Sequence, residues 1–375
     1  HTVRESKWKN GKGDVLKELA SACKLYGLKF GVYCSPWDRN NALYGTDKYL
    51  AIYQAQLKEL YSNFGELFMS WHDGANGGDG YYGGAKEKRS IDNTTYYDWN
   101  NTWAITRKMQ PMANIFSDIG LDVRWVGNED GHAAPTSWAT FTPMAPDGKS
   151  EAVPGQANYP QSPEGIRNGK FWMPAECDVP LRNGWFFHAN EKPKTPEKLF
   201  DLYLKSIGRG AGLDLGLAPN TEGILNADDV SSLQTFGSIL KNTFSVNLLN
   251  SAKISATNTR GKSYAVNNLT DGNKQTYWAT ADNTTEATLT FELNKPTTFD
   301  VISLQEFIAL GQRIDALHRI AAARCLVADD AVKGCGNTDG TTGIRANRDR
   351  HQTGGYRHTG TRGRAARNAW LVEAY

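Results

Sequence analysis

The sequence predicts an α/β fold: an incomplete (β/α)8-like barrel followed by a β-sandwich module. Helical and strand-like apolar patterns alternate along the first two thirds of the chain. They then give way to short period-2 runs broken by polar turns, which is typical of a sandwich. With 375 residues, the chain is also longer than the roughly 250 residues of an ordinary α/β barrel, so more than one domain fits its length.

The alternation begins with helically spaced apolar residues at 13–26 and a short buried run at 28–33. Such pairs are typical of a parallel sheet with right-handed crossovers. Five strands stand out, against eight in a closed barrel, so we expect the opening units to lie upstream of His1. Further helices are expected at 49–61, 96–109, 196–207 and 227–240, and further strands at 66–71, 113–117, 171–175 and 212–217.

The chain divides into three expected parts: a barrel at 1–244, a sandwich at 245–316 and an Arg/Ala/Gly-rich tail at 317–375. The tail has 9 Arg, 1 Lys and 5 acidic residues, a net charge of +5, whereas the preceding part carries a net charge of −3. A basic tail can bind nucleic acid. However, an abrupt change from Lys to Arg in mid-domain is also what a shifted reading frame produces. We therefore expect a frame-shifted or disordered tail and no nucleic-acid partner.

Several classes of protein are disfavoured by composition. No apolar run approaches the roughly 18 residues that span a bilayer, so we expect no membrane span. The five Cys are odd in number and lack paired C-x-x-C spacing, which argues against a zinc site or a disulfide framework. No His, Asp or Glu group has metal-ligand spacing, and the Gly-rich stretches do not match a phosphate loop. We therefore expect neither a metal nor another cofactor.

In parallel α/β folds, functional side chains gather at the carboxyl ends of the strands. Retaining hydrolysis of a glycosidic bond needs two carboxyl groups about 5–5.5 Å apart, one ionised and one protonated. Asp73 follows the apolar run LFMSW and precedes GANGG, whose small residues allow a ligand to approach closely. It is the candidate nucleophile, and the alternative is a turn or helix-capping Asp.

Glu129, in the segment RWVGNEDG, is the candidate acid. It lies between Gly127 and Gly131 and close to Trp125, and apolar surroundings disfavour the charged form of a carboxyl group, which suits a general acid. Asp130 is its rival. The alternative for Glu129 is a solvated loop carboxylate.

Two basic side chains adjoin these segments. His72 could contact sugar hydroxyls beside Asp73, or it could be hydrogen-bonded scaffold. Arg124, one strand position before Trp125, could hold a sugar hydroxyl or fix a carboxylate, and a structural ion pair is the alternative. The high aromatic load of 11 Trp, 16 Tyr and 14 Phe suits stacking on sugar faces but is weak support by itself.

Five ordered motifs within residues 1–244 resemble one known family. WKNGKGDVLKEL, KFGVYCSPWDRN, SWHDGANG, DVRWVGNEDG and FWMPAECDVPLRNGWFF together are similar to the α-L-fucosidases of glycoside hydrolase family 29, of the type selective for α-1,3/1,4-linked fucose. The resemblance implies a retaining exo-acting mechanism with Asp73 as nucleophile and Glu129 as acid/base. The fucose pocket that it implies is lined by aromatic residues and their neighbours, namely Trp37, Trp125, Trp185, Tyr33 and Arg124.

The resemblance also implies substrates, organisation and location. The substrate would be a fucosylated oligosaccharide or glycoconjugate, and the alternative is a non-catalytic carbohydrate-binding protein derived from such an enzyme. Residues 245–316 resemble the discoidin-like (F5/8 type C) sandwich. Family strands whose histidines hold fucose would lie upstream of His1, so we expect an N-terminally truncated chain. Similarity to gut-bacterial glycan-degrading enzymes suggests a periplasmic or secreted protein.

Overall fold

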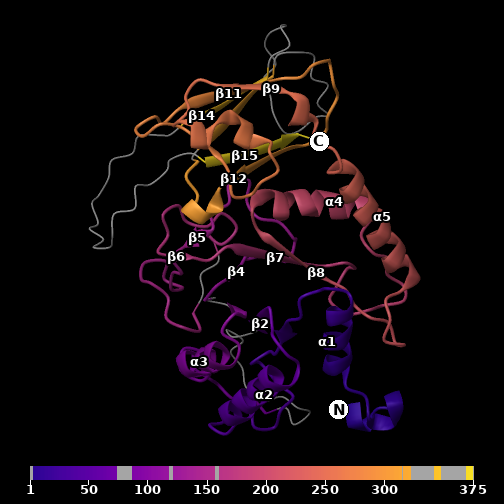
Figure 1. Cartoon of the computed structure of the whole chain (residues 1–375). Coiled ribbons are helices and arrows are strands. Elements are labelled where there is room, and N and C mark those ends of the chain that lie inside the picture. The colour runs from indigo at the N-terminus through magenta and orange to yellow at the C-terminus, as the bar shows by residue number, and fades with distance from the viewer. Residues whose placement is uncertain are drawn as a thin grey trace. The chain divides into compact units, whose positions relative to one another are not determined.

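A computed structural model of the chain describes residues 3–73, 87–117, 121–156, 160–314, 316–321, 342–347 and 369–374 (Figure 1). The chain forms two compact units, residues 1–232 and 233–375. The first unit is mixed α/β, and the second consists of antiparallel strands and short 3₁₀ helices. The division falls within helix α5 (Ala227–Thr243), whose end coincides with the expected boundary at residue 244.

Six parallel strands organise the first unit. Two groups pair in the orders β1-β2-β3 and β4-β7-β8, and a parallel bridge between Phe116 and Val123 joins β3 to β4. The carboxyl ends of all six strands therefore share one edge. Among the described strands, β1 and β8 each pair on one side, so closure into a barrel stays a prediction. The six are β1 (Val32–Tyr33), β2 (Met69–His72), β3 (Asn114–Ser117), β4 (Arg124–Trp125), β7 (Ala175–Pro180) and β8 (Gly212–Gly216).

The helices expected from the periodicity of the sequence are all present, and their ends agree to within a few residues. Short 3₁₀ helices η1 (Val3–Glu5), η2 (Trp8–Gly11) and η3 (Ile207–Arg209) accompany them. Besides α5, the α-helices of the first unit are α1 (Val15–Leu25), α2 (Tyr49–Asn63), α3 (Trp99–Met109) and α4 (Pro196–Lys205).

The strand expected at 171–175 is divided between two strands of the structure. Phe171–Trp172 (β6) pairs antiparallel with Thr140–Phe141 (β5), and the parallel strand β7 starts at Ala175. The sequence of β7 is AECDVP, whose two acidic residues and proline are unusual in a strand, and yet all six residues are buried. Its carboxyl groups are therefore buried inside the fold and do not lie in a solvated loop.

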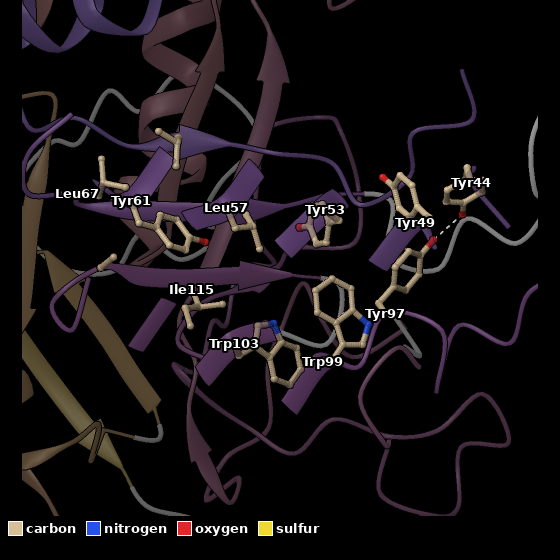
Figure 2. Close-up of a cluster of buried hydrophobic side chains, with 12 residues drawn as sticks. Tyr44, Tyr49, Tyr53, Leu57, Tyr61, Leu67, Tyr97, Trp99, Trp103 and Ile115 are labelled. Atoms are coloured by element: carbon tan, nitrogen blue, oxygen red, sulfur yellow. Dashed lines mark hydrogen bonds between the residues drawn. The ribbon is translucent and has the colours of Figure 1, made fainter. Parts of the chain in front are cut away.

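Helix α2 is held by a buried stripe. Tyr49, Tyr53, Leu57 and Tyr61 recur every four residues on one face, and none is more than 3% exposed. Figure 2 shows this stripe facing the tryptophans of α3. Burying a large apolar side chain stabilises a fold by roughly 1.5–3 kcal/mol, so this cluster fixes the two helices against β1, β2 and β3.

Helix α1 is formed differently. The Asp14 side chain caps its first turn by accepting a hydrogen bond from the Lys17 backbone N–H at 2.9 Å. None of its residues is buried, and Leu19 and Leu25 are 50% and 77% exposed. In the described part of the chain, α1 therefore depends on its cap and on local propensity more than on packing.

The second unit is a β-sandwich of two antiparallel sheets, ordered β13-β14-β11-β9 and β10-β15-β12. Strands β14 and β15 lie within the tail at 317–375, which differs from the expected end of the sandwich at residue 316. Its core includes Leu269, Trp278 and Leu289. The strands are β9 (Lys253–Ala256), β10 (Trp278–Ala279), β11 (Ala287–Glu292), β12 (Ile302–Glu306), β13 (Ala316–Ala321), β14 (Thr342–Asn347) and β15 (Ala369–Ala374), with 3₁₀ helices η4 (Leu248–Ser251), η5 (Lys262–Tyr264), η6 (Val266–Leu269) and η7 (Ile308–Leu310).

Candidate active site

The first three strands carry aromatic residues on one face of the sheet, here called the inner face. Tyr33, Trp71 and Phe116 are register partners across β1, β2 and β3. The Tyr33 and Trp71 ring centroids lie 5.6 Å apart, and those of Trp71 and Phe116 lie 4.6 Å apart. Because side chains alternate along a strand, Asp73, two residues after Trp71, follows on the same side. The expected position of Asp73 just after a strand is therefore confirmed.

Asp73 is held by the segment that follows β1. The Tyr33 hydroxyl donates a hydrogen bond to Asp73 Oδ2 at 2.5 Å, and the Ser35 hydroxyl donates to the Asp73 backbone carbonyl at 2.9 Å. Burial, and then the hydrogen bond to Asp73 and its negative charge, raise the pKa of Tyr33. Tyr33 therefore keeps its proton and acts as a donor at neutral pH. The small residues expected to admit a ligand, at 74–78, lie outside the described residues.

His72 does not lie where a sugar contact requires it. It occupies the strand position before Asp73, so its side chain points to the opposite, outer face and is fully buried against α2. Tyr53 Oη lies 2.5 Å from Nδ1, and Ser70 Oγ lies 3.2 Å from Nε2. Burial lowers the pKa of His72 to about 3, so the ring is neutral. The expectation of a sugar contact is corrected to a scaffold role.

The hydroxyl network around His72 continues into the helices. Tyr61 Oη lies 2.6 Å from Ser70 Oγ and 2.9 Å from Thr106 Oγ1 on α3. A buried network in which every polar group is hydrogen-bonded favours a single arrangement of its side chains. Breaking one of its hydrogen bonds leaves a buried group unpaired, at a cost of about 1–3 kcal/mol. The outer face of β2 is thus fixed by neutral hydrogen bonds directly behind Asp73.

The inner face of β4, β7 and β8 carries carboxyl groups that the sequence analysis missed. Trp125 is the register partner of Glu176, and Asp178 is the register partner of Asp214. The Trp125 indole N–H donates to Asp178 Oδ1 at 2.7 Å. The available signals were the alternation Glu-x-Asp within AECDVP and the Asp within GLDLG, which place all three acids on one face.

Burial dominates the protonation of this carboxyl cluster, which comprises Glu176, Asp178 and Asp214. Burial, followed by the charges of Asp214 and Asp178, raises the pKa of Glu176 to about 8. Burial also raises the pKa of Asp178 to about 6; the bond from Trp125 opposes this rise, and the charges of Glu129 and Asp214 add to it. Burial raises the pKa of Asp214. At neutral pH, Glu176 is therefore mostly protonated and Asp178 mostly ionised.

Glu129 lies in the loop after β4, and its charge acts on the carboxyl group of Asp178. Its side chain is exposed, as is that of Asp130, so the apolar surroundings expected for an acid are not found. Gly127 and Gly131 on either side have φ of 91° and 78°. A Cβ at Gly131 would lie 2.7 Å from Val179, so the loop needs glycine to turn over the end of β7.

Arg124 is also displaced from its expected place. It precedes Trp125, points to the outer face and is 2% exposed. Its Nε–H donates to the Ser162 carbonyl at 2.9 Å, and its Nη1 donates to the Met173 carbonyl. Burial lowers the pKa of Arg124 to about 10. The guanidinium therefore ties a loop to the sheet through carbonyl groups and does not face the inner surface. Within the described residues it forms no ion pair, which was the alternative considered for it.

The remaining predicted aromatics lie near the strand ends and are partly exposed. Trp37 is 37% exposed, with the Arg39 guanidinium 5.1 Å from its ring. Trp185 is 38% exposed, and a Cβ at Gly216 would lie 2.6 Å from its ring, so the indole packs on the inner face at the end of β8. The start of the loop that carries Trp185 is anchored by the buried ion pair between Arg182 and Asp229, at 2.9 Å.

The structure thus brings the predicted residues together in two sets along one strand edge. In the first set, Tyr33 is hydrogen-bonded to Asp73. In the second, Trp125 is hydrogen-bonded to Asp178, whose carboxyl group interacts electrostatically with Glu129. Within the described ranges, no three His, Cys, Asp or Glu side chains are placed to hold a metal ion. Over the same residues, no helix is both long and apolar enough to cross a membrane.

The second unit has a hollow of its own. A cavity of about 270 Å³ is lined by residues 274–277 and 305–309. The rings of Tyr277 and Phe307 stack in its wall with centroids 4.3 Å apart. Stacked aromatic faces with nearby polar groups are one way to bind a small polar ligand with apolar faces.

Comparison with known families matches both units. The family model described as "Alpha-L-fucosidase" matches residues 2–243, and the model described as "F5/8 type C domain" matches residues 253–316. "Alpha-L-fucosidase 1" of Arabidopsis thaliana is 38% identical over 323 residues, which are 85% of this chain and 60% of that protein. The chain spans about 60% of the length of the curated relatives it matches.

Solved structures agree with this similarity. A glycoside hydrolase 29 family member from an unknown rumen bacterium has a TM-score of 0.72 at 34% identity, covering 92% of this chain and 59% of that one. A Ruminococcus gnavus GH29 fucosidase, solved in complex with fucose, has a TM-score of 0.74 at 25% identity, covering 98% of this chain and 76% of that one.

Proposed function

The chain belongs to the α-L-fucosidase family, and from this premise we propose that its protein is a retaining exo-α-L-fucosidase acting through Asp73 and Glu129. The proposed scaffold is a (β/α)8-like barrel. The observation that carries the proposal is the placement of Asp73 at a strand end on the inner face, with Tyr33 bonded to Oδ2 at 2.5 Å. The site then needs one nucleophile and one acid at the same edge, and Glu129 follows a strand of that sheet.

In the first step, Asp73 attacks the anomeric carbon of a terminal α-linked fucose, and Glu129 gives its proton to the leaving oxygen. The C–O bond to the leaving sugar breaks as a covalent glycosyl-enzyme ester forms. Because Tyr33 occupies Oδ2, the other oxygen of Asp73 is available for attack. The bond also fixes the orientation of the carboxylate, which helps to hold a reactive geometry.

In the second step, Glu129, now a carboxylate, takes a proton from water while the water oxygen attacks the anomeric carbon. The ester bond to Asp73 breaks, and fucose leaves with its original anomeric configuration. An exposed Glu129 suits this exchange with solvent. We propose that the indoles of Trp125 and Trp185, which lie on the inner face, stack on sugar faces.

The proposed substrates are fucosylated oligosaccharides or glycoconjugates with terminal α-1,3- or α-1,4-linked L-fucose. The support is the likeness of the motifs to that subgroup, together with the tryptophans near the strand ends, which could accommodate a branched leaving group. For location, we propose the periplasm or the exterior of the cell, on the same likeness.

A direct test incubates the protein with an aryl α-L-fucoside and a Lewis-type branched trisaccharide. We expect both to release fucose, and ¹H NMR should show the α-anomer first, before mutarotation. Release of the β-anomer would contradict retention. Cleavage of α-1,2-linked fucose in preference to the branched substrate would contradict the proposed linkage.

The cavity of the second unit favours a second candidate function, binding of carbohydrate without hydrolysis. Its support is the stacked pair Tyr277 and Phe307 in the cavity wall. Isothermal titration with fucosylated glycans separates the two functions. Binding that is lost in Tyr277→Ala, together with no fucose release by the unmodified protein, would favour the binding function over the enzyme.

A further inference from the structure

We propose that Asp178 is a positioning residue that works through Trp125: its carboxylate holds the indole of Trp125 against β7. The inference deepens the proposed function and rests on it. Asp178 lies within the motif FWMPAECDVPLRNGWFF but was not a predicted site residue, because the strand was expected to end at residue 175.

The first support is geometric. Trp125 and Asp178 lie on neighbouring parallel strands, and strand alternation places both on the inner face. The indole N–H donates to Asp178 Oδ1 at 2.7 Å, which is short for an N–H donor and typical of a charged acceptor. The Asp178 residue is 6% exposed, so water cannot readily replace the indole as its partner. The bond therefore fixes the ring orientation of Trp125.

The second support is the arrangement of charge. Three other carboxyl groups interact electrostatically with Asp178 or with its neighbours. They are Glu129 in the loop after β4, Glu176 on the same strand as Asp178, and Asp214 on β8. The cations Arg124 and Arg209 act instead on Cys177, whose side chain points to the outer face. No described cation is thus identified next to Asp178 on the inner face. The side-chain donor that contacts Asp178 is the indole N–H of Trp125.

The third support is the carboxyl group of Glu176, one of whose oxygens is buried without a partner. Glu176 Oε1 has no hydrogen-bond partner in the described part of the chain, and the residue is 7% exposed. A buried carboxyl group in this condition holds its proton. Glu176 therefore takes the neutral role in the cluster, which leaves Asp178 as the charged acceptor of the indole N–H of Trp125.

Three variants separate the role of the Asp178 acceptor oxygen from the role of its charge. Asp178→Asn keeps an oxygen acceptor for the indole and removes the charge. Asp178→Ala removes both, and Trp125→Phe removes the indole donor but leaves the charge. ¹⁵N-indole NMR of the full chain, with the Trp125 signal assigned through Trp125→Phe, reports the bond without any need for activity. Asp214→Asn is the matched control, because Asp214 is the register partner of Asp178 and its amide would not reach the indole bond.

We expect the Trp125 N–H to stay protected from exchange in Asp178→Asn and to exchange faster in Asp178→Ala. In Asp178→Asn, KM should change little, because the amide oxygen still accepts the bond from the indole N–H. In Asp178→Ala, KM should rise as it does in Trp125→Phe, and the double variant should show no additive rise.

An unchanged indole signal in Asp178→Ala, or a KM that rises as much in Asp178→Asn as in Asp178→Ala, would overturn the proposal. If Asp178→Ala does not fold, Trp125→Phe and Asp178→Asn still decide it. Failure of the proposed function looks different: the unmodified protein then releases no fucose, while the indole signals still report whether Asp178 holds Trp125.

Discussion

The two halves of the strand edge surround their carboxylates with opposite chemistry. Neutral groups surround Asp73: the Tyr33 hydroxyl on the inner face, and Tyr53, Ser70 and a neutral His72 on the outer face. The strands on the Glu129 side carry the buried carboxyl groups of Glu176, Asp178 and Asp214. One sheet can therefore follow its strand ends with a neutral hydroxyl network in one half and with buried acids in the other.

Removal of the nucleophile should have the largest effect. In Asp73→Asn, the amide cannot form the glycosyl-enzyme ester, and we expect kcat to fall by about 10⁴-fold or more. The fold should be unchanged, because Asn still accepts the bond from Tyr33 through its carbonyl oxygen. Steady-state kinetics with an aryl fucoside measure the loss. A loss of less than tenfold would remove Asp73 from the chemistry.

Next in size is the loss of the acid. Glu129→Gln should lower kcat/KM for a branched glycan by roughly 10²–10⁴-fold, and by much less for an aryl fucoside whose leaving group needs little protonation. Asp130→Asn is the matched control, since the two exposed carboxylates are adjacent in the chain. Equal losses in both variants, or a larger one in Asp130→Asn, would transfer the role to the rival residue.

The buried His72 makes the nucleophile side sensitive to acid. Its pKa falls to about 3 in the fold, against about 6.5 when unfolded. Its contribution to stability is therefore present above pH 6.5 and is lost as the pH falls towards 3. Between pH 6.5 and 4.5, protonation of His72 should lower the free energy of unfolding of the unmodified protein by roughly 2 kcal/mol. We expect this part of the decrease to be absent in His72→Gln. Urea titrations at both pH values measure it, with His132→Gln as control; parallel slopes for all three proteins would contradict a buried neutral ring.

The carboxyl cluster should show the reverse dependence. Burial raises the pKa of Glu176 from its ordinary value near 4.5 to about 8. Its contribution is therefore present below pH 4.5 and is lost as the pH rises through 8. Relative to the unmodified protein, Glu176→Gln should gain roughly 4 kcal/mol at pH 8 and less than about 1 kcal/mol at pH 5. Thermal unfolding at the two pH values tests this, with exposed Glu222→Gln as control. A gain of the same size at both values would show that Glu176 is not titrating.

Much of the fold followed from sequence periodicity, and the site was found only in part. The helical spacing of α2 and the strand-end place of Asp73 were readable because burial repeats along one face. His72 and Arg124 were misplaced because each is next to a functional residue in sequence, and in a strand adjacent side chains point to opposite faces. The strand β7 was missed because buried acids resemble a loop. The exposure of Glu129 depends on the backbone turn at Gly131, and the spacing of apolar residues in the sequence does not predict such a turn.

Trapping the covalent intermediate tests most directly which of the two sets of carboxyl groups provides the nucleophile. A 2-deoxy-2-fluoro-α-L-fucosyl fluoride slows both steps, while its good leaving group lets the first step proceed, so the glycosyl-enzyme ester accumulates. Peptide mapping by mass spectrometry then locates the label. We expect it on the peptide containing Asp73, and we expect none in Asp73→Asn. A label on Glu176, Asp178 or Asp214 would contradict the assignment and place the nucleophile in the carboxyl cluster.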